Sequence, residues 1–252
     1  MAIICKNCNN QFEGKFCNNC GQKADTQRFT LHYLWQDVKP LIFKFSNKGI
    51  LYTSRQLFTR PGHSIREYIE GKRVVHFGPF SLLLAFAALY GFLYHYFKID
   101  PFSDISGDGS LFGDIGPERM NEWISTHFSL VTILALPLYS FSSYIVFRKQ
   151  GYNLAEHLII NAFLASQRLM VRIITFPLLS YFNGTDYLHA VTDLLLLIDI
   201  ILMIWSFSQF FSGLKLIRSV LLTILNYLIF FVGFSFFIWV AITIISKILK
   251  YL

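Results

Sequence analysis

The chain has 252 residues, of which 54% are hydrophobic and only 15% are charged, and its mean hydropathy is +0.47. Soluble domains carry roughly 25% charged residues, so this composition excludes an ordinary water-exposed globular protein. The 27 phenylalanines exclude an intrinsically disordered chain, because such chains are poor in aromatic residues and rich in charge. The formal net charge is +7. Because charged residues are few, their positions along the chain indicate how it is oriented in a membrane.

The first feature along the chain is a set of four cysteines arranged as two C-x2-C pairs: Cys5, Cys8, Cys17 and Cys20. Each pair can wrap a tight turn around one ion, and two such knuckles supply the four tetrahedral thiolates that zinc prefers. Asn9 and Gly21 follow the two pairs, where a knuckle favours a residue that tolerates positive φ. The sequence therefore predicts a Zn²⁺ ribbon over residues 1–26.

The expected role of this ion is structural. A site with four cysteine ligands has no open position for catalysis, and so short a ribbon has little core without the metal. Residues Gln11 to Phe16, centred on Glu13 and Gly14, are expected to form a hairpin that joins the two knuckles.

Residues 27–77 are expected to form an amphipathic, helical segment next to the membrane. From Thr30 to Phe45 apolar residues recur at steps of three and four, which predicts a helix with one apolar face. Pro40 should kink or divide this helix. Its apolar face could rest on anionic lipid headgroups or pack on the transmembrane helices, and the sequence leaves both alternatives open.

A shorter helix is predicted before the first membrane span. Ser64 and Glu67 have the spacing of a capping box, and Gly71 is a suitable stop after Glu70. Four basic residues around this helix are expected to contact lipid headgroups or a partner protein: Arg60, Arg66, Lys72 and Arg73.

Residues 78–252 contain five runs that are long and apolar enough to cross a bilayer, which takes about 20 residues. We expect the spans near 78–97, 128–147, 154–182, 187–211 and 219–246. The predicted fold class is therefore an all-α integral membrane protein with five transmembrane helices, preceded by the ribbon and the amphipathic segment.

The distribution of charge predicts the orientation. Twelve of the 22 Lys and Arg residues precede the first span, and basic and acidic loops then alternate along the chain. This alternation predicts a cytoplasmic N-terminus and, with five spans, a C-terminus outside. Lys247 and Lys250 in the tail are the exception.

Two of the predicted spans carry charged residues inside the membrane. The third span has a polar stripe on one helical face, formed by His157, Asn161, Arg168, Arg172 and Thr175. An arginine or aspartate near the bilayer centre costs roughly 2.5–3.5 kcal/mol, so it must pair or face water. Counting inward from the turn at Asn183 and Gly184 predicts two ion pairs with the fourth span, Arg168 with Asp199 and Arg172 with Asp193.

These pairs have two interpretations. They could hold two helices in register, or they could line a pocket that binds an anionic lipid, a substrate or a proton. The mouth of such a pocket would hold Glu156, His157 and Asn161. Pro137 and Pro177 lie inside spans, where they would kink the helices and open space.

The N-terminal third carries a family resemblance. The stretch CKNCNNQFEGKFCNNCGQK, followed by TSRQLFTRPGHSIREYIEGKRVVHFGPF, resembles an uncharacterised bacterial family of zinc-ribbon, multispan membrane proteins that is catalogued as a domain of unknown function. The recurrent motifs are Arg60-Pro61-Gly62, Arg66-Glu67-Tyr68, Gly71-Lys72-Arg73 and Pro79, with His76 where the family has another aromatic residue. The resemblance implies this architecture and a bacterial cytoplasmic (inner) membrane, and it implies no activity.

Two functions follow as hypotheses. No H-E-x-x-H, G-x-S-x-G or phosphate-loop motif occurs in the chain, so the first is a non-enzymatic membrane adaptor or accessory subunit of a larger complex. It would dock a protein partner through the ribbon and contact membrane lipids, with no nucleic acid. The alternative is a small transporter or lipid-binding protein that uses the Arg/Asp stripe. An intramembrane hydrolase is a third and weaker hypothesis, because no nucleophile and base are placed together.

Overall fold

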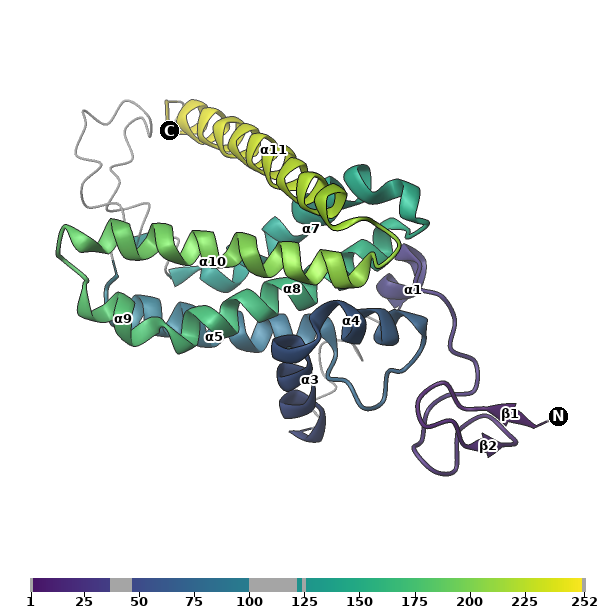
Figure 1. Ribbon diagram of the computed structural model, residues 1–252. Helices are drawn as coiled ribbons and strands as arrows, with labels where there is room; N and C mark the ends of the chain where they lie inside the picture. The colour runs from purple at the N-terminus through teal and green to yellow at the C-terminus, as the bar shows by residue number, and fades with distance from the viewer. Residues whose placement is uncertain (1, 37–46, 100–121, 124–125, 251–252) are drawn as a thin grey trace.

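The computed structural model describes residues 2–36, 47–99, 122–123 and 126–250 (Figure 1). Its two short strands are β1 (Ile3–Ile4) and β2 (Gln11–Phe12), and its helices follow in the order α1 (Leu31–Gln36), α3 (Asn47–Thr59), α4 (Pro61–Glu70), α5 (Pro79–Tyr96), α7 (Phe128–Phe147), η1 (Arg148–Gln150), α8 (Leu154–Ile174), α9 (Phe176–Tyr181), α10 (Tyr187–Phe210) and α11 (Leu216–Lys250).

Five helices in the described part of the chain are long and apolar enough to cross a membrane: α5, α7, α8, α10 and α11. The predicted fold class, an all-α multi-pass membrane fold with an N-terminal four-cysteine unit, is confirmed. The ribbon, α1 and α4 lie at one end of the bundle, called the ribbon end here, and α9 lies at the opposite end (Figure 1).

Helix α8 forms the centre of the bundle. It is 67% buried over its apolar window, whereas the other four spans are 39% buried or less. It packs on α5, α7 and α10 and also on α3 and α4. Helix α11 is the most peripheral span, with 11% of its window buried, and it diverges from α10 towards its C-terminal end (Figure 1). The polar stripe predicted on α8 therefore lies on the helix with most neighbours.

The third span differs from its prediction. It was expected to run over residues 154–182, but α8 ends at Ile174 and the separate helix α9 follows. Pro177 lies in the first turn of α9. A proline lacks the N–H that a helix needs and its ring collides with the carbonyl four residues before it, here that of Ile173, so the helix ends before Pro177. Helix α7, in contrast, continues through Pro137.

The segment before the membrane also differs from its prediction. Only Leu31–Gln36 of the expected helix to Phe45 is described, and the remainder, with Pro40, lies outside the described residues. Helix α4 begins at Pro61, not at a Ser64 cap, because a proline is favoured in the first turn of a helix. The predicted stop at Gly71 is confirmed, since this residue adopts φ 126°.

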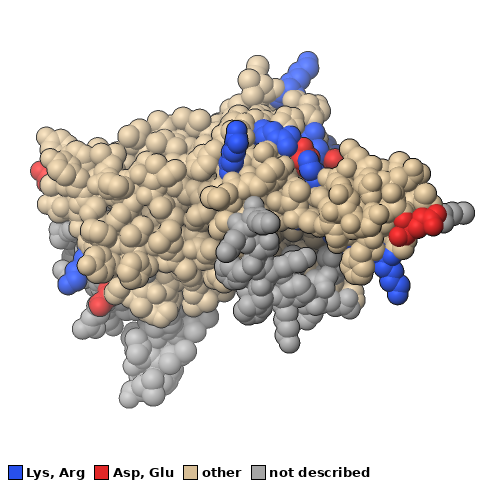
Figure 2. Space-filling view, turned by 90° about the horizontal axis from the view of Figure 1, so that it is seen from below, with Lys and Arg blue, Asp and Glu red and all other residues tan. Residues whose placement is uncertain are grey.

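Charged residues are unevenly distributed over the molecule. On the face shown in Figure 2, Lys and Arg gather over the half that holds α3, α4 and the ribbon, and a broad surface over the spans carries almost no charge. Such a surface is suited to lipid, as the apolar composition of the spans requires.

Candidate functional site

The four cysteines form a compact cluster in the ribbon. All four Sγ atoms lie within 4.8 Å of one another, with 3.5 Å between those of Cys5 and Cys20 and 3.6 Å between those of Cys8 and Cys17. A tetrahedral zinc site with Zn–S bonds of about 2.3 Å has S–S edges of about 3.8 Å. The cluster can therefore hold one metal ion with little adjustment.

Each knuckle has the backbone that the sequence predicts. Asn9 has φ 59° and Gly21 has φ 75°, and their N–H groups donate to the carbonyls of Cys5 and Cys17 at 2.9 Å and 2.8 Å. The two pairs thus repeat one local geometry, which aims all four thiols at a common centre.

The strand pairing within the ribbon corrects one prediction. β2 pairs with β1, so that Phe12 lies opposite Ile3, and Phe16 forms a bridge with Lys23. The expected hairpin from Gln11 to Phe16 is therefore wrong. Each knuckle folds back on itself and pairs the residues on its own two sides, while the turn at Gly14, with φ 102°, only connects them.

Burial and hydrogen bonding shift the pKa values of two of the thiols in opposite directions. Burial raises the pKa of the Cys20 thiol to about 11. Burial also acts to raise the pKa of Cys17, but hydrogen bonds from the backbone at Cys20 and Asn19 outweigh it and bring this pKa to about 6. Four thiolates at these distances repel one another, so full ionisation of the cluster needs a cation at its centre.

The ribbon is attached to the loop between α4 and α5. Gln22, the glutamine of the CGQK sequence, is 3% exposed, and its side chain donates to the carbonyl of Gly71 at 2.5 Å. It also accepts from the N–H groups of Arg73 and Val74 at 3.2 Å and 3.3 Å. Sequence analysis did not single out Gln22, although it lies within the motif that carries the resemblance.

A second attachment joins the chain after the ribbon to the start of α8. Arg28 donates from Nε and from a terminal nitrogen to the two carboxylate oxygens of Glu156, both at 2.7 Å, and Glu156 raises the pKa of Arg28 by hydrogen bonding and by its charge. Asn153 caps α8 in a capping box with Glu156. Glu156 therefore faces Arg28. It lines a cavity of about 280 Å³ beside the chain after the ribbon and does not line the one that holds Arg168 and Asp199.

The four basic residues predicted to contact headgroups or a partner all make contacts within the chain. Arg60 and Lys72 pair with Glu67 at 2.8 Å and 3.1 Å; burial acts to raise the pKa of Glu67, but these two cations outweigh it and lower this pKa. Arg66 donates to the carbonyls of Gln209 and Phe210 at the end of α10. Arg73 lies 3.7 Å from the centre of the Phe29 ring. Whether these residues also contact lipid or a partner stays a prediction.

His157 and Asn161 form a buried polar link between α7 and α8. Ser143 Oγ lies 2.9 Å from His157 Nδ1 and accepts from Asn161 Nδ2 at 2.8 Å. His157 and Ser143 are both 0% exposed, so neither forms a mouth. The structure thus brings a serine and a histidine together, which the sequence did not predict, and their burial makes the contact a bond between helices.

The predicted ion pairs are wrong in register. Arg172, not Arg168, pairs with Asp199, from Nε at 3.2 Å and from a terminal nitrogen at 2.5 Å. Counting from the turn had assumed one continuous helix to residue 182, but the break before α9 shifts the pairing by one helical turn. Asp193 is exposed. Asp193 and Asp199 do not share a face of α10, because a separation of six residues turns the side-chain direction by about 240° around the helix axis.

Arg168 instead contacts tyrosine. It donates to the Tyr139 hydroxyl at 3.3 Å, and its guanidinium lies 4.8 Å from the centre of the same ring. Among the described residues, neither Nε of Arg168 nor Oδ1 of Asp199 has a hydrogen-bond partner, although both atoms are buried. The sequence did not predict Tyr139 as the partner of Arg168, because aromatic residues are common in membrane spans.

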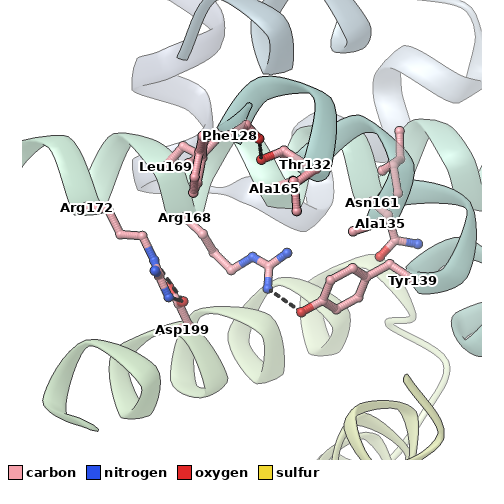
Figure 3. A pocket seen from close by; sticks show the side chains of 12 residues that line it. Phe128, Thr132, Ala135, Tyr139, Asn161, Ala165, Arg168, Leu169, Arg172 and Asp199 are labelled. Atoms are coloured by element: carbon pink, nitrogen blue, oxygen red, sulfur yellow. Dashed lines mark hydrogen bonds and ion pairs between the residues drawn. The ribbon is translucent and has the colours of Figure 1, made fainter. Parts of the chain in front are cut away.

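These side chains line a cavity of about 190 Å³ between α7, α8 and α10 (Figure 3). Its polar wall is formed by Tyr139, Asn161, Arg168, Arg172 and Asp199, and its apolar wall comes mainly from α7. Two guanidinium groups face one carboxylate, so the polar wall carries one excess positive charge. Such a wall can bind an anion.

The comparison with known families concerns α3, α4 and most of the first span, α5. Residues 47–91 match the model of a family described as a protein of unknown function (DUF3667). The predicted resemblance to a domain of unknown function is thereby confirmed. No curated protein and no solved structure matches the chain. The matched residues cover α3, α4, the loop after them and α5 as far as Gly91.

The motif residues in this match build the junction between the helices. A Cβ at Gly62 would lie 2.3 Å from the backbone nitrogen of Phe210, so only glycine allows α4 to contact α10 so closely. Tyr68 stacks on Phe29 and meets Phe163 edge to face. The matched segment therefore joins the ribbon, α8 and α10 at the ribbon end.

Proposed function

We propose that this membrane protein binds an anionic amphiphile, a molecule with a phosphate or carboxylate head and an apolar part, in the cavity between α7, α8 and α10. One observation carries the proposal: Arg168 and Arg172 line the same cavity as the single carboxylate of Asp199, which pairs with Arg172 only. An unneutralised arginine costs several kcal/mol there. An anionic head would neutralise Arg168, and a guanidinium binds phosphate or carboxylate through two parallel hydrogen bonds.

The size and walls of the cavity support an amphiphile over a free ion. The cavity volume of about 190 Å³ is below the ~300–1,000 Å³ of pockets that enclose whole drug-sized ligands. It suits a head group whose tail extends outwards. Phe128, Val131 and Ala135 of α7 offer an apolar wall. The Arg172 side chain is 32% exposed, so the cavity is open beside it.

The identity of the metal ion and the orientation in the membrane are part of the same proposal. The ion in the cysteine cluster is Zn²⁺, because four thiolates in two knuckles are the typical ligand set of a structural zinc site. The distribution of Lys and Arg supports a cytoplasmic N-terminus and a C-terminus outside, and the family resemblance supports a bacterial inner membrane. The cavity then lies in the outer half of the inner membrane, since it extends to Phe128 at the end of α7 opposite the ribbon.

Native mass spectrometry of the purified protein tests the binding proposal. Wild-type protein is expected to retain one anionic lipid in mild detergent, and Arg168→Gln is expected to lose it at least tenfold. Arg218→Gln removes an exposed arginine at the start of α11 and should retain the lipid. Displacement by inorganic phosphate would assign a water-borne anion instead, and equal retention by Arg168→Gln would overturn the proposal.

We propose the adaptor function as a second candidate, supported by the surface of the ribbon. Ile4 and Phe16 are 68% and 60% exposed, and apolar and aromatic side chains of this kind occupy the centres of protein interfaces. A stoichiometric membrane protein should copurify with the wild type and be lost with Ile4→Ser/Phe16→Ser, while the metal content stays unchanged. Lys23→Ser, also on the exposed ribbon surface, is the matched control. Retention by the double variant would exclude this surface.

A further inference from the structure

We propose that α3 is an interfacial helix, which lies in the plane of the membrane at the ribbon end and presents Leu51, Arg55 and Phe58 to lipid. The proposal goes beyond the cavity, because none of these residues lines it. Its partner is the lipid leaflet at the ribbon end, with apolar side chains among the acyl chains and Arg55 at the phosphates.

The C-terminal end of α3 contacts two spans, α8 and α10. Gln167 donates to the carbonyl of Leu57 at 2.8 Å and accepts from Ser206 at 3.0 Å. Gln167 lies thirteen residues after Leu154, the first residue of α8, which is about 20 Å along the helix axis. Ser206 lies one turn before the end of α10 at Phe210. The end of α3 is therefore level with the last turn of α10, at the ribbon end of that span.

The sequence fixes α3 at this depth. Leu57 would bond to the N–H four residues later, but that residue is Pro61, which has none. The buried carbonyl needs another donor, and Gln167 supplies it. Gly62 then brings the next turn into direct contact with Phe210. The Gly62 N–H also donates to Gln209 Oε1 at 3.2 Å. The corner between α3 and α4 is thus joined to α8 by one hydrogen bond and to α10 by a second hydrogen bond and a backbone contact.

The other part of α3 meets the entrance of the first span. Thr53 Oγ1 accepts from the N–H of Phe77 at 2.8 Å, and a Cβ at Gly49 would lie 3.1 Å from the same nitrogen. Phe77 precedes α5 by two residues. Helix α3 thus contacts the entrance of α5 through Thr53 and contacts α8 through Leu57. Figure 1 shows it lying crosswise to the spans and projecting from the bundle.

The two faces of α3 differ in their surroundings. Gly49, Thr53 and Leu57 are buried at steps of four, towards the bundle. Leu51 is 78% exposed and Phe58 is 38% exposed, with exposed Arg55 between them at steps of four and three. Exposed apolar side chains level with the membrane spans require an apolar neighbour. A long arginine side chain can reach the headgroups from such a position.

Photocrosslinking in the intact protein tests this inference. The photoreactive amino acid p-benzoylphenylalanine would replace Leu51 or Phe58, with exposed Leu197 of α10 as the positive control and exposed Glu70 of α4 as the negative control. The protein would be irradiated in vesicles that contain phosphatidylglycerol, and adducts would be identified by mass spectrometry. We expect lipid adducts at Leu51 and Phe58 at a yield close to that of Leu197 and at least fivefold above that of Glu70.

Each other outcome overturns the inference. Yields equal to that of Glu70 would place α3 in water. Adducts to a second copy of the chain, which would double its mass, would make this face a protein interface. Gel filtration of each variant shows whether it is folded. Arg55→Gln gives an independent measurement: without the arginine at the lipid phosphates, the yield of phosphatidylglycerol adducts at Leu51 should fall at least twofold, and an unchanged yield would overturn the role of Arg55.

Discussion

The ribbon and the intramembrane cavity are both polar sites, but they are assembled in opposite ways. The ribbon takes its four ligands from sixteen consecutive residues, Cys5 to Cys20, and each knuckle has its own turn and strand pairing. The cavity takes its polar wall from three helices, with Tyr139, Arg168 and Asp199 far apart in the sequence. A local site depends on its ion, whereas a tertiary site depends on the packing of the whole bundle.

Removing the metal should have the largest effect, and it should be confined to the local site. Chelation or Cys17→Ser is expected to reduce the bound metal from one ion per chain to none and to unfold residues 2–26, because metal binding supplies on the order of 10 kcal/mol to such units. Metal analysis and hydrogen exchange would measure this, with circular dichroism as the control. A large loss of helical signal would show that the bundle depends on the ribbon.

Breaking the ion pair in the cavity should destabilise the bundle and spare the ribbon. Asp199→Asn removes the ion-pair partner of Arg172, whose side chain is 32% exposed, which costs at most about 3 kcal/mol. The expected result is a fall in the melting temperature in detergent. Asp193→Asn changes an exposed residue of the same helix and should leave the melting temperature unchanged. Equal effects of the two substitutions would contradict the observed pairing.

Acid should destabilise the segment between α4 and α5, to which the ribbon is attached, because this segment contains His76. Burial lowers the pKa of His76 to about 4, below the ordinary value near 6.5. Between these two pH values the imidazole is protonated in the unfolded chain but neutral in the folded protein. The contribution to stability is complete above pH 6.5 and falls as the pH decreases to 4, by about 3 kcal/mol at most. Unfolding measurements at pH 7 and pH 4.5 should show a smaller loss in His76→Phe. The phenylalanine can keep the aromatic contacts with Tyr52 and Tyr68.

A smaller effect is expected where α4 contacts α10. Gly62→Ala forces the two backbones apart, because the new Cβ would lie 2.3 Å from the nitrogen of Phe210, and overpacking of this kind costs about 1–3 kcal/mol. Gly213→Ala adds a methyl group with no neighbour within 4 Å and is the matched control. Denaturant unfolding would compare the free energies of unfolding of the two variants. An unchanged free energy for Gly62→Ala would show that α4 and α10 can move apart without cost.

The difference between local and tertiary sites also explains which predictions hold. Spans were found from apolar composition and knuckles from cysteine spacing, because both signals lie in neighbouring residues. The early end of α8 follows from Pro177, whose effect the sequence suggested as a kink. The pairing of Arg172 with Asp199 could not be counted correctly, because that break shifts the register by one turn.

The sequence by itself determined the five apolar spans, the four-cysteine cluster and the positive φ of Asn9 and Gly21. Only the tertiary structure decided that Tyr139 faces Arg168 and that Gln22 attaches the ribbon to the bundle. The reason is physical. Bilayer length and the geometry of a metal knuckle act on neighbouring residues, whereas a partner for a buried charge is chosen by the packing of helices from distant parts of the chain.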